Sequence, residues 1–126
     1  MKTIIEITNI IEATNPRSAW NRGVKTYALE ILADLPNNVE YGSIEALKAD
    51  ALCGASDWDQ YSWGACSLVY NEDIAKRLCT PSELKKTCNG ERNPNAQENW
   101  LDCQARALRQ AWWMIRNAAV GAGLLF

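Results

Sequence analysis

The apolar residues between positions 18 and 36 recur at helical spacing, and this pattern constrains the fold more than any other feature. They step by 4, 3, 4 and 4 along the chain and are Trp20, Val24, Tyr27, Ile31 and Leu35. This spacing places them on one side of an α-helix. Ser18 is a preferred N-cap just before the stripe, and Pro36 follows its last member. The sequence therefore predicts a helix from about residue 19 to residue 35.

Similar signals predict helices elsewhere in the chain. An isoleucine-rich stretch predicts a helix over 3–13, and Ser43 is the expected N-cap of a helix over 44–53. The last and longest helix is expected from about Ala96 to Val120, where Gly121 and Gly123 stop it. Shorter helical signals occur between residues 56 and 90. For residues 62–70 the sequence pattern fits either a helix or one short buried strand.

Length and composition agree with one soluble domain. The chain has 126 residues, of which 48% are hydrophobic and 22% charged, with a formal net charge of −2. Glu6 and Glu12 interrupt the apolar N-terminal stretch, which argues against a signal peptide. No apolar run approaches the length of a membrane span. We predict a compact all-α bundle of five to seven helices, with residues 1–126 forming a single α-helical domain that does not bind membranes.

The absence of histidine restricts the possible chemistry. It removes Ser/His and Cys/His nucleophile pairs, the commonest general base, and metal sites built on imidazole. Asp57 and Asp59 resemble the start of a calcium loop, but Leu68 stands where the EF-hand glutamate belongs. The glycines form no phosphate-binding loop. We therefore predict that the protein is not an enzyme and binds no metal or cofactor.

The cysteines show no close pair. They are Cys53, Cys66, Cys79, Cys88 and Cys103. Zinc clusters and redox sites usually contain a CxxC pair, and an odd number leaves one thiol over in any disulfide framework. The sequence favours small buried thiols in a reducing cytoplasm, with no required disulfide.

One short segment concentrates aromatic and acidic side chains. The chain has six tryptophans but only one phenylalanine, and the candidates for partner binding are Asp57, Trp58, Asp59, Tyr61 and Trp63. Tryptophan and tyrosine often anchor protein interfaces. A tryptophan-rich core is the simpler explanation of the same composition, and Trp20 and Trp112 are expected to be core residues.

Arginines mark the last helix as a second candidate surface. At about 100° per residue, Arg106, Arg109 and Arg116 lie on one side of the helix, and no acidic residue follows Asp102. The pattern indicates a surface for an anionic partner. Stabilisation of the helix dipole explains part of the same pattern.

Residues 73–86 resemble a helix-turn-helix stretch with a short polar turn. Lys76, Arg77, Lys85 and Lys86 are the candidate phosphate contacts. Cys79 occupies the position of the usual turn glycine. The alternative is a helical hairpin whose charged face is simply solvated, since neighbouring acidic residues nearly cancel the four cations.

The segment from Ser56 to Arg109, together with SAWNRGVKTYALEILADL, resembles a small family of uncharacterised proteins from conjugative elements and prophages of Gram-positive gut bacteria. The resemblance implies a cytoplasmic protein of mobile-element type, without catalytic residues to carry over. By genomic setting it suggests an inhibitor of a host defence nuclease, of the anti-CRISPR kind. We expect a non-enzymatic protein-binding module; the alternative is a helix-turn-helix accessory or regulatory protein that binds DNA.

Overall fold

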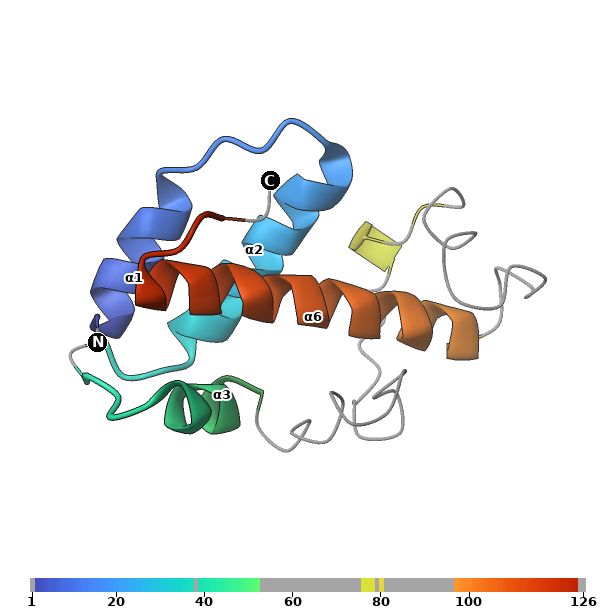
Figure 1. Ribbon diagram of the computed structural model, residues 1–126. Helices are drawn as coiled ribbons and strands as arrows, with labels where there is room; N and C mark the ends of the chain where they lie inside the picture. The colour runs from blue at the N-terminus through green and yellow to red at the C-terminus, as the bar shows by residue number, and fades with distance from the viewer. Residues whose placement is uncertain (1, 38, 53–75, 79, 81–96, 125–126) are drawn as a thin grey trace.

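The computed structural model describes residues 2–37, 39–52, 76–78, 80 and 97–124 (Figure 1). Four labelled helices lie in these ranges: α1 (Ile4–Glu12), α2 (Ala19–Ala33), α3 (Ile44–Leu52) and α6 (Gln97–Val120). A helical turn covers 76–78. The described residues contain no strand, only an isolated antiparallel bridge between Thr3 and Glu40. The predicted all-α fold is confirmed, and residues 62–70 lie outside the described part.

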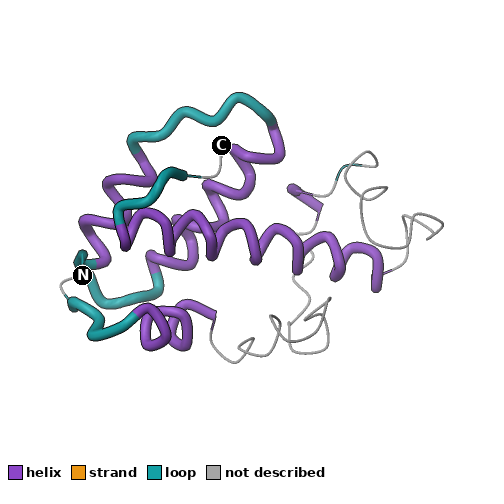
Figure 2. The backbone as a smooth tube through the Cα atoms, in the orientation of Figure 1, coloured by secondary structure: helices purple, strands orange, loops and turns teal. Residues whose placement is uncertain are grey.

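The long helix α6 organises the packing. It crosses α1 and α2 and contacts α3, while α2 also packs against α1 and α3 (Figures 1 and 2). The fully buried side chains at the centre come from all four helices and include Ile7, Leu32, Leu47, Met114 and Ile115. The packing of the core therefore determines which side of α6 faces the other helices and which side faces away from them.

The helix ends follow from local hydrogen bonds. Ser18 Oγ accepts a hydrogen bond from Asn21 N at 3.0 Å, and Ser43 Oγ accepts one from Ala46 N at 3.1 Å. Both residues were predicted as caps. Gly121 ends α6 with a φ of +79°, as predicted, in a conformation that favours glycine.

The first helix begins with a capping box that the sequence analysis did not identify. Thr3 Oγ1 accepts a hydrogen bond from Glu6 N, and Glu6 Oε1 accepts one from Thr3 N at 3.1 Å. Hydrogen bonds that Thr3 N and Thr3 Oγ1 donate to Glu6 Oε1 lower the pKa of the exposed Glu6 carboxyl. The Thr-x-x-Glu spacing from Thr3 to Glu6 is the sequence signal that could have predicted this capping box.

Gly23 lets the turn at 76–78 approach α2 closely. A Cβ at position 23 would clash with Leu78 Cδ2, and the Leu78 side chain is buried. Glycine inside a helix costs about 1 kcal/mol relative to alanine. The close contact with Leu78 explains why glycine fits this position.

We predict that the effect of Gly23→Ala on the free energy of unfolding has opposite signs in the wild-type protein and in a Leu78→Ala variant. In the wild-type protein the clash should outweigh the gain in helix propensity, lowering the free energy of unfolding by about 1 kcal/mol. In a Leu78→Ala background the clash is gone, and Gly23→Ala should raise the free energy of unfolding by roughly 0.5–1 kcal/mol. Urea denaturation of the four proteins measures both values. Stabilisation in both backgrounds would mean that Leu78 does not pack on Gly23.

Candidate functional site

Several predicted site residues lie outside the described part of the chain. They are Asp57, Trp58, Asp59, Tyr61, Trp63, Lys85 and Lys86. The described candidates are the three arginines of α6 and the Lys76–Arg77 pair.

The exposed side of α6 carries an unusual set of side chains. In its described part, the exposed residues are Trp113, Arg116 and Val120, and the half-buried Arg109 lies beside them. At about 100° per residue these four fall within about 60° of each other around the helix axis. We call Arg109, Trp113, Arg116 and Val120 the α6 strip.

The two adjacent tryptophans of α6 have opposite environments. Trp112 is 3% exposed and belongs to the core, as predicted, whereas Trp113 is 43% exposed. Val120 is 51% exposed and lies two helical turns after Trp113. Trp113 and Val120 were not among the predicted site residues. The signal was present, because helical spacing puts both on the side that carries Arg109 and Arg116.

Arg106 has a different role from Arg116. Its guanidinium carbon lies 4.2 Å from the centroid of the Trp20 ring, in a cation–π contact between α6 and α2. Trp20 Nε1 donates a hydrogen bond to Gln110 Oε1 at 2.6 Å. Trp20 is half-buried and packs against the core. Arg106 and Gln110 therefore help to hold α2 on α6.

A further cation, Lys2, lies near the end of the α6 strip. A Cβ built on Gly121 would lie 3.6 Å from Lys2 Nζ, so this ammonium group lies beside the C-terminus of α6. A cation at this position interacts favourably with the helix dipole. Lys2 Nζ thus lies beside the residue that follows Val120, the last member of the α6 strip.

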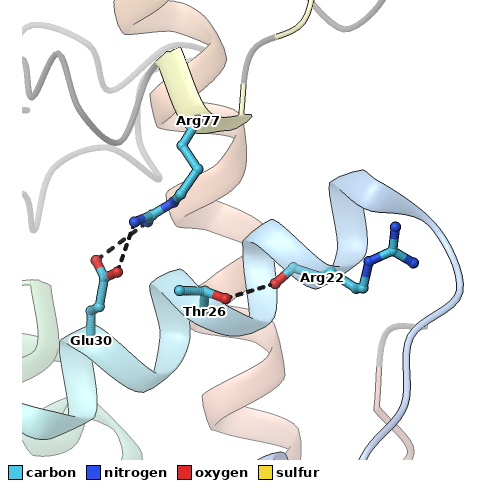
Figure 3. A network of polar contacts seen from close by, with 4 residues as sticks. All are labelled: Arg22, Thr26, Glu30 and Arg77. Carbon is cyan, nitrogen blue, oxygen red and sulfur yellow. Dashed lines mark hydrogen bonds and ion pairs between the residues drawn. The ribbon is translucent and has the colours of Figure 1, made fainter.

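Arg77, a predicted DNA contact, forms an ion pair with Glu30 of α2 (Figure 3). Its Nη1 and Nη2 donate to the two carboxylate oxygens of Glu30 at 2.9 and 3.4 Å. Both side chains are exposed, so the pair contributes little to stability. The ion pair with Glu30 does, however, engage the Arg77 guanidinium, which is the group that would otherwise contact a DNA phosphate. Lys76 is exposed on the same turn.

Tyr27 and Gln104 form a buried polar contact between α2 and α6. Burial raises the pKa of the Tyr27 hydroxyl above its ordinary value of 10.0, and Glu30 adds to the effect, while the Gln104 hydrogen bond opposes it. The phenol therefore stays neutral at pH 7, and it is unsuited to proton transfer there.

The raised pKa of Tyr27 predicts a loss of stability at alkaline pH. The folded state keeps this proton at a pH where the unfolded chain has lost it, so the stabilisation is complete below pH 10.0 and falls above it. Tyr27→Phe should therefore lose less stability than the wild type between roughly pH 9 and pH 11. Urea denaturation across this range is the measurement. Identical losses in both proteins would contradict the assignment.

The state of Cys103 differs from the prediction that all five cysteines are reduced thiols. This fully buried residue of α6 is disulfide-bonded, and its partner lies outside the described residues. The prediction of five reduced cysteines is therefore wrong at Cys103, because spacing along the chain does not show which cysteines meet in the fold. Disulfides are uncommon in a reducing cytoplasm, so the cysteines no longer support that location.

We predict that Cys103 in purified protein resists alkylation until a reductant is added. Reduction should lower the free energy of unfolding by about 2 kcal/mol, because the crosslink restricts the unfolded chain. Mass spectrometry after alkylation under denaturing conditions identifies the modified cysteines. Alkylation of Cys103 in unreduced protein would contradict the bond.

The described residues contain no group of three or more Cys, Asp or Glu side chains arranged to hold a metal ion. None of the described helices has the length and apolarity needed to cross a bilayer. Comparisons of the chain with protein-family models, curated proteins and solved structures find no match.

Proposed function

We propose that the protein is a non-enzymatic protein-binding module and that the α6 strip is its binding surface. The observation that carries this proposal is the exposure of Trp113 on a helix whose other side forms the core. Leaving 43% of a large aromatic side chain exposed to water sacrifices part of the burial energy that the next residue, Trp112, obtains by facing inward. A partner that covers Trp113 recovers that energy.

The composition of the strip supports a protein partner. Tryptophan and arginine are the residue types most enriched among those that dominate binding energy at protein interfaces. Trp113 and Val120 supply apolar area, and Arg116 supplies a charged group beside them. Because α6 is held by contacts with three other helices, the strip is presented on a rigid support.

An inhibitor of a host defence nuclease remains the proposed class of protein. This part of the proposal depends on the resemblance to proteins of mobile elements. The α6 strip is basic and apolar, so this surface does not imitate a nucleic acid. We propose that it binds the nuclease through a protein surface.

A cytoplasmic site of action belongs to the same proposal, and it requires that Cys103 is reduced in the cell and that its disulfide forms after lysis. Alkylation of intact cells before lysis tests it separately from binding. An oxidised Cys103 in cells would place the protein in an oxidising compartment instead.

Photocrosslinking tests the proposal directly. A benzophenone amino acid replaces Trp113 in one variant and Val39 in a control, since Val39 is also 43% exposed but lies outside α6. In lysate of the host, we expect a discrete protein crosslink from position 113 and none from position 39. Crosslinks of equal yield at both positions, or none at 113, would contradict a binding surface on α6. A crosslink to DNA would favour the DNA-binding alternative.

A further inference from the structure

We infer that the α6 strip takes an acidic amphipathic protein segment, whose apolar side chains cover Trp113 and Val120 and whose carboxylates face Arg116 and Lys2. This inference rests on the proposed function, and it adds the chemistry of the partner. It follows from the order of side chains along the surface and from the distribution of charge.

Apolar and cationic groups alternate along this surface. Trp113, Arg116 and Val120 follow each other on one side of α6, and Lys2 Nζ lies beside Gly121 at the end of the helix. Trp113 and Val120 are seven residues apart, a rise of about 10 Å along the helix. A partner helix presents side chains seven residues apart at the same rise. Two apolar residues at that spacing match Trp113 and Val120, with an acidic residue between them facing Arg116.

The α6 part of this surface has charges of one sign. Residues 103–124 contain Arg106, Arg109 and Arg116 but no aspartate or glutamate. The exposed Glu6 carboxylate lies near Lys2, and hydrogen bonds from Thr3 N and Oγ1 lower its pKa and keep it ionised. It partly offsets the charge of Lys2, so the excess positive charge of the surface comes from the arginines of α6. A partner with carboxylates at the edge of an apolar contact is therefore complementary in both charge and polarity.

The same features favour a protein over a nucleic acid. Phosphate-binding surfaces collect many cations, whereas in the described part of α6 the exposed cation is Arg116. Trp113 could stack on an unpaired base. The aliphatic Val120 has no comparable role toward bases or phosphates, but it extends an apolar contact with a protein.

A titration followed by NMR tests the inference on the full-length protein without an identified partner. The probe is a synthetic helical peptide of about 15 residues with leucine on one side and glutamate along its edges. The same peptide with lysine in place of glutamate, and a single-stranded oligothymidylate, are the comparison ligands. The Trp113 indole signal is assigned by its loss in Trp113→Phe.

We expect the glutamate peptide to shift the Trp113 indole signal saturably, and the lysine peptide to leave it unchanged. Arg116→Glu should weaken binding of the glutamate peptide at least about tenfold. Arg17→Glu makes the same charge change in the α1–α2 connection and should leave the affinity within about twofold.

Three results would overturn the inference. They are equal binding of the two peptides, stronger binding of oligothymidylate, and a concentration-dependent shift of the indole signal in the protein alone, which would assign the surface to a second copy. None of them affects a position-specific crosslink from residue 113. A crosslink at 113 without a preference for the acidic peptide would therefore uphold the protein-binding function and reject the acidic partner.

Discussion

Replacing Trp112 by alanine is expected to lower the free energy of unfolding by about 3–5 kcal/mol. The side chain is 3% exposed and packs within the core that α6 shares with α1, α2 and α3. Its removal loses the transfer energy of the indole and leaves a cavity that the surrounding helices can fill only in part. Most small domains have a total stability of about 5–15 kcal/mol, so the variant should be close to unfolded at 37 °C.

Trp113→Ala is the matched control for that measurement. It removes the same side chain from the neighbouring position of the same helix, but from the exposed side. The expected destabilisation is smaller, about 1–2 kcal/mol, because 43% of the Trp113 side chain is already exposed and alanine has the higher helix propensity. Urea denaturation of the two variants compares them directly. Equal destabilisation by the two substitutions would contradict the orientation of α6.

The sequence predicted the described helices well because their signals are local. Ser18, Ser43 and Gly121 act within one turn of the helix ends that they define, and the stripe from Trp20 onward reflects a single periodicity. The last helix was expected from Ala96 to Val120 and is observed over Gln97–Val120. Such features depend on residues within a few positions of each other.

The missing information concerned contacts between distant segments. The disulfide at Cys103, the packing of Leu78 on Gly23 and the ion pair of Arg77 with Glu30 each join residues far apart in sequence. Spacing gives no distance across the fold, so none of these could be predicted.

The candidate surface was only partly predicted, for a related reason. Helical periodicity placed Arg106, Arg109 and Arg116 on one side of α6, but it could not show that Trp20 covers Arg106. It also places Trp113 on the side of Arg109 and Arg116, but it could not show that this side is exposed until the packing of the helix was known. The fold of α6 against three helices supplies that direction.

Loss of partner binding is the second large effect that we expect. If Trp113 is the central anchor of the interface, Trp113→Ala should weaken binding by about 2–4 kcal/mol, or a factor of roughly 30 to 1,000. Val120→Ala should have a smaller effect, because less apolar area is removed. Val39→Ala is its control: a valine of similar exposure in another part of the surface, which should bind as the wild type does.

The most direct test is calorimetric titration of the partner identified by crosslinking from position 113. The partner is purified and titrated against the wild-type protein, Trp113→Ala, Val120→Ala and Val39→Ala, each shown to be folded by circular dichroism. Our account predicts that Trp113→Ala weakens binding at least about 30-fold, Val120→Ala weakens it less, and Val39→Ala leaves it unchanged. An affinity of folded Trp113→Ala within about twofold of the wild type would contradict the account and place the binding surface elsewhere on the molecule.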